Sequence, residues 1–385
     1  MDQNQLERLK DVIQDCNLNF LLGSGLSMPY IRTLGNIETL LTAVDKASLP
    51  ATEAQVVRCS LYKLYFDQVM LRNKSILEKD AASAPVQAAY SGLLRTLNTI
   101  LQRRKSTLLG KEINLFTTNV DIFIERSLEE IGLEFNDGFN GRFKPRFSLS
   151  NFNKSRSKRS LHFDNVSEIP VFNLIKLHGS VTWHLEDDRT MTFSASLDKV
   201  GAIAALQIAD GCLVKVDEEA KFEDVAAAAK TLTVTKEMSA FIEAYEDLLV
   251  VNPTKEKFKH TLLNQTYYEL LRIFSNELEK DNSVLFVMGF SFADEHIREI
   301  TLRAANSNPT LLVYVFAHST ASAELIRSQL GKDIKNANIN IIAPNPGPNG
   351  DDLNYDLATI NRAIFQRMFP DETDSLPVNP AKEQE

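Results

Sequence analysis

A short apolar stretch that ends in two glycines constrains the fold of this chain more than any other feature. Residues 18–22 form a run of the kind found in buried strands. Gly23-Ser24-Gly25 follows, and glycine lets the backbone turn tightly and come close to a ligand. A helical pattern begins soon after Ser27. Because free N–H groups and the helix dipole both favour a bound anion, this order predicts a phosphate-binding turn.

The same residues would also fit an ordinary strand-to-helix turn with serine caps. The motif differs from the G-x-G-x-x-G pattern of dinucleotide-binding turns because no third glycine follows Gly25 in the turn. Short motifs of this kind also occur by chance. Taken alone, the turn therefore leaves a dinucleotide phosphate site and a purely structural turn as equal alternatives.

Short apolar strands alternate with helical segments along most of the chain. Alternation of this kind, with glycines at the strand ends, is typical of α/β folds. We therefore predict a Rossmann-like, doubly wound parallel sheet. The predicted helices cover residues 3–15, 122–131, 258–279, 294–305 and 356–368, and the further strands cover residues 113–117, 171–177, 283–288, 310–316 and 338–342.

Two long segments interrupt this alternation. Residues 36–110 place apolar side chains at helical spacing, which predicts a helical insertion between the first two strands. Residues 185–250 carry few clear signals, and we assign them to a second, poorly defined insertion. We expect one domain over residues 1–369 and a disordered polar tail over residues 370–385, which holds several prolines.

Composition excludes several classes of protein. The 385 residues carry a formal net charge of −9, which argues against broad binding to nucleic acid. Cys16, Cys59 and Cys212 lie far apart and form no C-x-x-C pair, so neither a zinc ribbon nor a disulfide framework is predicted. The first residues lack the features of a signal peptide, and no apolar run approaches a membrane span. We expect a soluble, cytoplasmic protein with no metal site and no membrane partner.

A basic segment lies between the second and third predicted strands. Residues 136–160 contain glycines, a proline and several serines, which predict a loop. Seven lysines and arginines fall within residues 142–159. The segment could be a solvated loop, a lid over phosphates or a docking surface. We favour docking, either between identical subunits or onto an acidic partner, since seven cations are too many for one buried phosphate site.

Polar residues follow two of the predicted strands. Asn119 and Asp121 come after residues 113–117, and His178 comes after residues 171–177. Ligands in parallel α/β sheets bind at the carboxyl ends of the strands. Taken alone, these residues favour helix caps at Asn119 and Asp121 and a structural role for His178. Histidine nevertheless suits proton transfer at neutral pH, so these positions define a candidate ligand crevice.

Four motifs, in this order, resemble those of the sirtuin family over about residues 15–320. Gly23-Ser24-Gly25-Leu26-Ser27 resembles the family's G-A-G-x-S loop, and Thr117-Thr118-Asn119-Val120-Asp121 resembles its T-Q-N-I-D. Leu177-His178-Gly179 is similar to its L-H-G, and Gly289-Phe290-Ser291 is similar to its later G-T-S turn. The stretch Phe-Ser-Phe-Ala-Asp-Glu-His-Ile at 290–297 further resembles the prokaryotic sirtuin-like branch found in anti-phage defence systems.

The chain also departs from the sirtuin deacylases. Their zinc module needs two cysteine pairs, which Cys16, Cys59 and Cys212 cannot supply. The G-I-P-D-F-R motif that follows their glycine loop is not recognisable in Met28-Pro29-Tyr30-Ile31-Arg32. Residues that would hold an acyl-lysine peptide are not evident either. The resemblance therefore implies an enzyme that cleaves NAD itself, with deacylation as an alternative.

The resemblance and the chemistry of NAD cleavage together assign roles to single residues. Breaking the bond between nicotinamide and ribose develops an oxocarbenium-like sugar, so the site must hold the ribose and bring in water. Asn119 would orient a water or a ribose hydroxyl, and His178 would act as general base. By resemblance, Asp121 would hold the nicotinamide carboxamide. The expected NAD-binding residues are completed by Gly23, Ser24, Gly25 and Ser27 at the diphosphate and by Gly289 and Ser291 near the adenosine.

The resemblance also implies a biological role and a partner. Members of the defence branch deplete NAD when triggered, form homo-oligomers and often pair with a hexameric ATPase of the HerA type. We expect an NAD hydrolase without a metal cofactor, whose product is either ADP-ribose or cyclic ADP-ribose. One alternative is an NAD-dependent protein deacylase. A second is a non-catalytic module that senses NAD or ADP-ribose.

Overall fold

The computed structural model describes most of the chain. Within the described residues, seven strands form one sheet in which every neighbouring pair is parallel, and the strand order is β13-β12-β11-β1-β2-β8-β3. The predicted doubly wound parallel sheet is therefore confirmed. The described residues are 3–33, 35–104, 109–152, 154–187, 190–217, 219–251, 261–331, 336–344 and 354–368. The strands are β1 (Asn17–Leu22), β2 (Glu112–Thr117), β3 (Glu134–Asn136), β8 (Val171–Lys176), β11 (Ser283–Met288), β12 (Leu312–Phe316) and β13 (Ile339–Ile342).

The central strands are apolar along their whole length because both faces of the sheet are covered. In β11, Val284, Phe286 and Met288 belong to one hydrophobic core, whereas Leu285 and Val287 belong to the other. Successive side chains of a strand point to opposite faces, so a strand buried on both sides reads as an uninterrupted apolar run. This is the physical reason why these strands can be located from sequence.

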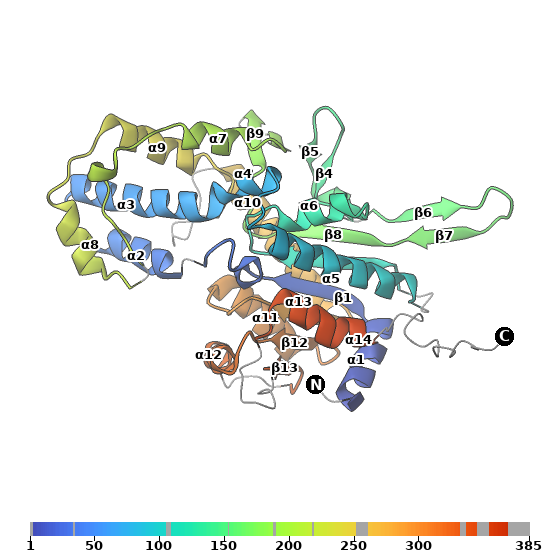
Figure 1. Cartoon of the computed structure of the whole chain (residues 1–385). Coiled ribbons are helices and arrows are strands. Elements are labelled where there is room, and N and C mark those ends of the chain that lie inside the picture. The colour runs from blue at the N-terminus through green and yellow to red at the C-terminus, as the bar shows by residue number, and fades with distance from the viewer. Residues whose placement is uncertain are drawn as a thin grey trace, which may run out of the picture.

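Helices supply the second surface of each core. One core is completed by α1, α5, α6 and the segment α13–η5–α14, and the other by α10, α11 and α12. Figure 1 shows these helices on the two sides of the sheet. The helices are α1 (Gln3–Asp15), α5 (Ala84–Gln102), α6 (Phe123–Glu130), α10 (Thr261–Glu279), α11 (Glu295–Ser307), α12 (Thr320–Leu330), α13 (Leu357–Ile360), the π-helix η5 (Asn361–Phe365) and α14 (Gln366–Met368).

The two predicted insertions are not separate units in the structure. Helices from residues 35–77 pack against helices from residues 198–246 and form one helical lobe at the left of Figure 1. The Tyr62 and Tyr245 rings stack with centroids 4.3 Å apart. In contrast, α5, which also falls within residues 36–110, packs on α6 beside the sheet. The lobe contains α2 (Gly35–Lys46), α3 (Ala51–Tyr65), the π-helix η2 (Phe66–Met70), α4 (Arg72–Leu77), α7 (Asp198–Ala204), α8 (Phe222–Ala229) and α9 (Lys236–Glu246).

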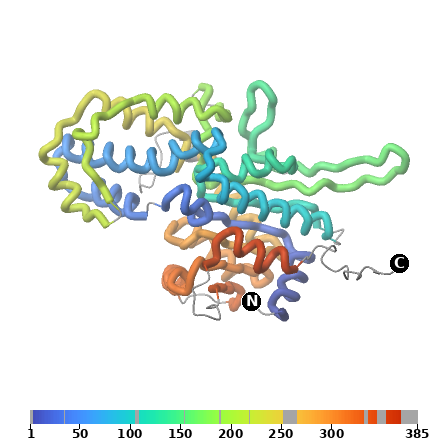
Figure 2. Tube along the Cα trace, in the orientation of Figure 1, coloured from blue at the N-terminus to red at the C-terminus, as the bar shows by residue number. Residues whose placement is uncertain are grey.

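The segment predicted as a basic loop contains two hairpins instead. The first joins β4 (Phe139–Asn140) to β5 (Arg146–Phe147), and the second joins β6 (Arg156–Arg159) to β7 (Val166–Ile169). The β6–β7 hairpin extends well beyond the sheet (Figure 2). Sequence patterns missed it because Arg-Ser-Lys-Arg has no apolar alternation, and all four residues of β6 are exposed.

Other differences from the sequence-based elements are smaller. The hairpin of β9 (Trp183–Asp187) and β10 (Thr190–Phe193) was not predicted, and neither were α7, α12 and β3. The predicted helix at 356–368 is interrupted by the π-helix η5. The predicted disordered tail, residues 370–385, lies outside the described residues. Among the helices that the structure describes, none is both long and apolar enough to cross a bilayer.

Candidate active site

Two glycine turns meet at the carboxyl edge of the sheet. One follows β1 and the other follows β11, and these two strands are neighbours in register. The Gly25 N–H donates to the Gly289 carbonyl oxygen at 3.0 Å. A Cβ atom on Gly23 would lie only 2.4 Å from that same oxygen, and Gly289 itself has φ +62°. Glycine is therefore needed here because the two turns approach each other closely. The sequence had predicted a different reason, close approach of the backbone to a ligand.

The turn after β1 does not lead directly into an α-helix. Ser24–Ser27 form a single 3₁₀ turn, η1, and the next α-helix, α2, begins at Gly35. The predicted helix N-terminus behind the glycine turn is therefore wrong, so no α-helix dipole acts at this position. The N–H groups of Gly23, Gly25 and Leu26 all donate to backbone carbonyls. An anion at this turn would have to use the remaining polar groups of the turn.

A buried polar network ties the first turn to the end of β2. The Ser27 hydroxyl donates to the Asp121 carboxylate at 2.7 Å and lies 3.1 Å from the Tyr90 hydroxyl. The Asn119 amide donates to the Gly23 carbonyl at 3.2 Å and to Ser27 Oγ at 3.3 Å. Asn119 is only 4% exposed, and its Oδ1 accepts no hydrogen bond within the described residues. Such a fixed, underused acceptor is a candidate for ligand contact.

Asp121 is held from both sides by the protein. Its second carboxylate oxygen accepts the Phe123 N–H at 3.2 Å, at the start of α6. Burial raises the pKa of the Asp121 carboxyl, and the nearby Lys176 ammonium opposes that rise. Lys176 is itself buried, donates to the Asp121 carbonyl and pairs with Glu125 at 2.6 Å. Both Asp121 oxygens are thus engaged, so a role toward a carboxamide would require one of them to be shared.

His178 follows β8 and faces the second turn. The Gly179 backbone has φ +77°, and a Cβ atom there would lie 2.0 Å from the Leu249 carbonyl oxygen, so only glycine fits after this histidine. Nε2 of His178 lies 3.1 Å from Oδ2 of Asp294, within ion-pair distance when the imidazole is protonated. The two groups are not aligned as a hydrogen bond. The other Asp294 oxygen accepts the Ile297 N–H at 3.0 Å and caps α11.

These elements surround one cavity of about 620 Å³. Most of the predicted site residues line it, but Gly23 and Ser27 do not. Ser27 is fully buried and acts through its bonds to Asn119 and Asp121. The predicted residues at the cavity wall are Ser24, Gly25, Asn119, Asp121, His178, Gly289 and Ser291.

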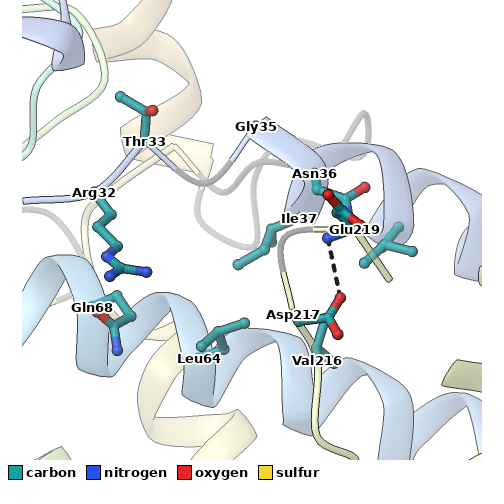
Figure 3. A pocket seen from close by; sticks show the side chains of 11 residues that line it. Arg32, Thr33, Gly35, Asn36, Ile37, Leu64, Gln68, Val216, Asp217 and Glu219 are labelled. Carbon is teal, nitrogen blue, oxygen red and sulfur yellow. Dashed lines mark hydrogen bonds between the residues drawn. The ribbon is translucent and has the colours of Figure 1, made fainter. Parts of the chain in front are cut away.

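A second hollow of about 900 Å³ adjoins the first on the side of the helical lobe. Both are lined by Arg32, Thr33 and Gly35, which connect the first turn to α2. Figure 3 shows the Arg32 side chain directed toward Gln68, with Asp217 on the opposite wall. The lobe therefore borders the second hollow, and Glu38 of α2 also lines the first.

Several residues of this site are not marked by any local sequence pattern. Tyr90 was not named within the predicted helical insertion, and Lys176 was only one position of the strand predicted over residues 171–177. Their contacts join segments far apart in the chain, so no local pattern marks them. Asp294 did carry a signal, since it lies in the stretch after Gly289 that resembles the defence branch.

Comparisons with known proteins add no identification. No model of a protein family matches this chain, and no curated protein matches it. Among the residues that the structure describes, no three or more His, Cys, Asp or Glu side chains gather as a metal site would require. The expected absence of zinc stays a prediction.

Proposed function

We propose that this chain is an NAD hydrolase that cleaves the bond between nicotinamide and ribose. One observation carries the proposal: the segments that follow β1, β2, β8 and β11 border a single cavity, and Asn119 and His178 both line it. A crevice outside the carboxyl ends of parallel strands is where α/β folds bind dinucleotides. The sirtuin-like order of the motifs supports NAD as the ligand.

The proposed reaction uses water as the second substrate. The bond between nicotinamide N1 and ribose C1′ breaks, and its electron pair neutralises the pyridinium. The oxygen of water forms a bond to C1′, and His178 takes the proton that the water releases. The products are nicotinamide, ADP-ribose and a proton. Because the leaving group is already cationic, the site needs no strong acid.

The contacts of Asn119 and His178 indicate how each would act. The Asn119 amide is fixed by Gly23 and Ser27, which leaves its Oδ1 to orient a water or a ribose hydroxyl. Oδ2 of Asp294 lies 3.1 Å from Nε2 of His178, and Asp294 would act as a positioning residue for the imidazole. Contacts of this kind are often poorly aligned without substrate and tighten when it binds.

The biological role proposed here rests on the sirtuin-like motifs alone. By that resemblance, the chain is an anti-phage effector of bacterial cells that depletes cytoplasmic NAD when triggered. Its activity would be regulated in an oligomer and by a HerA-type ATPase partner. Binding of nucleic acid by this chain itself is not expected, given its net charge of −9.

The direct test is incubation of the purified full chain with NAD, alone and with a candidate ATPase, followed by separation of the products. We expect nicotinamide together with ADP-ribose, and cyclic ADP-ribose would indicate that a ribose hydroxyl replaces water. A parallel reaction contains an acylated lysine peptide. Release of nicotinamide only when that peptide is present would show a deacylase and overturn the proposal. Tight NAD binding without any turnover, with or without the ATPase, would indicate a sensing module.

A further inference from the structure

The two hairpins beside the sheet carry exposed apolar side chains at their ends. Phe143, in the turn between β4 and β5, is fully exposed, and Leu161, in the turn between β6 and β7, is 95% exposed. Phe163 and Val166 are exposed as well. A two-stranded hairpin that packs on nothing is marginally stable in water, and grouped exposed apolar residues mark interaction sites.

The same hairpins are basic. Residues 142–169 contain seven lysines and arginines and only two acidic residues, in a chain whose net charge is −9. Three of these cations form ion pairs, all at the surface: Lys144 with Glu186, Arg156 with Glu134 and Arg159 with Asp164. Exposed pairs contribute little to stability, so these charges are better placed to meet a partner than to hold the fold.

The helical lobe has the opposite charge. Residues 198–247, which include α7, α8 and α9, contain eleven acidic and five basic residues. Glu219, Glu223 and Glu243 are among the exposed acidic residues. Figure 1 places this lobe at one end of the molecule and the β6–β7 hairpin at the other. The two surfaces therefore cannot meet within one chain.

We propose that the β6–β7 hairpin of one chain docks onto the acidic face of α8 and α9 in a second copy. Complementary charge steers such an encounter, and the apolar turn residues would be covered in the contact. Because the two surfaces differ and lie at opposite ends, the contact is head-to-tail and repeats from copy to copy. A nucleic acid would match the cations but would leave Leu161 and Phe163 without apolar partners.

The test uses two charge-reversed forms of the full chain in sedimentation experiments. The hairpin variant is Arg156→Glu/Lys158→Glu/Arg159→Glu, and the lobe variant is Glu219→Lys/Glu223→Lys/Glu243→Lys. We expect the wild type to assemble with rising concentration and less so at high salt, while each variant loses the larger species. Each variant keeps one intact surface. The reversed charges of the two variants also complement each other, so an equimolar mixture should form the larger species again.

A matched control carries the same change of charge elsewhere. Arg272→Glu/Arg303→Glu/Arg327→Glu alters three exposed arginines on α10, α11 and α12 and should assemble as the wild type does. Circular dichroism checks that all variants are folded. A second form, Leu161→Ser/Phe163→Ser, should weaken assembly at every salt concentration because it removes the apolar part of the contact.

Several results would overturn this proposal. A wild type that stays a single chain at all concentrations would do so, and so would a hairpin variant that assembles normally. A mixture that fails to form the larger species would exclude the head-to-tail arrangement. Retention of duplex DNA by the wild type, lost in the hairpin variant while assembly is unchanged, would assign the hairpin to nucleic acid. None of these measurements uses NAD, so they are independent of the proposed function.

Discussion

The crevice at the strand ends and the β6–β7 hairpin place polar side chains in opposite surroundings. In the crevice, Asn119 and Asp121 are each 4% exposed and each form several hydrogen bonds. In the hairpin, every residue of β6 is exposed. A buried polar group must have partners, which fixes its position, whereas a surface charge can move to meet a ligand. The comparison is consistent with the proposed chemistry in the first region and the proposed docking in the second.

The largest expected effect is on cleavage in the crevice. Asn119→Ala and His178→Ala should each lower kcat/KM for NAD by about 100-fold or more, the usual scale for acid–base groups. His162→Ala, on the exposed hairpin, is the matched control and should leave the rate unchanged. Rates are measured as nicotinamide release by the folded variants. Near-normal turnover by either crevice variant would remove that residue from the proposed mechanism.

A smaller effect on cleavage is expected from Asp294, which lies beside His178. Asp294→Asn keeps an oxygen that can cap α11 but removes the charge beside His178. We expect kcat to fall by about 10-fold with little change in KM, since orientation of a base is a modest part of its contribution. In the double variant with His178→Ala, the aspartate change should cost nothing further, because its effect passes through the imidazole.

The matched control for Asp294→Asn is an aspartate on the β6–β7 hairpin. Asp164→Asn removes a fully exposed carboxylate and should change neither kcat nor KM. Additive losses in the Asp294 and His178 double variant would show that Asp294 acts elsewhere, for example only on the start of α11.

Asp137, which lies between β3 and β4, tests how much the burial of a carboxylate costs in stability. Burial raises the pKa of its carboxyl from 3.8 to about 6. The folded state therefore holds the proton more tightly than the unfolded state, and stability falls as the pH rises from about 4 to about 6. Asp137→Asn removes this cost and should raise the free energy of unfolding at pH 7 by about 1–2 kcal/mol.

The measurement for Asp137 is urea unfolding at several pH values. The gain from Asp137→Asn should shrink as the pH falls below 6 and vanish below the unfolded pKa of 3.8. Asparagine can still accept the Phe139 N–H, so the local bond is kept. A gain that is independent of pH would mean that ionisation of Asp137 is not the source of the cost.

A still smaller effect on stability is expected from the hairpin charges. Arg156→Glu/Lys158→Glu/Arg159→Glu should change the free energy of unfolding of the single chain by less than about 0.5 kcal/mol, as is usual for exposed charges. Any basal NAD cleavage by the single chain should persist. A raised KM for NAD together with unchanged assembly would instead make the hairpin a lid over the substrate.

No effect is expected from removal of metal. Cys16, Cys59 and Cys212 form no C-x-x-C pair in the sequence, so we expect treatment with a chelator to leave both unfolding and cleavage as they were. Elemental analysis provides the independent check. One tightly held zinc per chain would contradict the prediction and favour the deacylase alternative.

The sheet could be predicted from sequence because each of its central strands is marked by a pattern within its own few residues. Residues 283–288 are apolar at every position since both faces of β11 are covered, and a glycine follows directly. The packing of the two insertions against each other could not be predicted. Tyr62 and Tyr245 stack although they are 183 positions apart in the chain, and no sequence pattern links them. The β6–β7 hairpin could not be found for another reason: all four residues of β6 are exposed, so the strand has no apolar alternation.

The candidate site could be predicted in part. The residues after the strands were found because strand ends of a parallel sheet share one edge. The reason for the glycines was not found, since the contact between Gly23 and Gly289 depends on which strands are neighbours. For the same reason Tyr90 and Lys176 could not be placed. The catalytic roles of Asn119 and His178 stay predictions.

The strand order has a consequence for synthesis of the chain on the ribosome. β1 is made well before β11, although the two strands are neighbours in the sheet, with Asn17 opposite Ser283. At roughly 5–20 residues per second, β1 waits on the order of ten to fifty seconds before that neighbour exists. During this time its apolar edge is an open template for other nascent chains. Chaperone binding to the emerging β1 segment would protect it, and shortening the wait by circular permutation should raise the soluble yield.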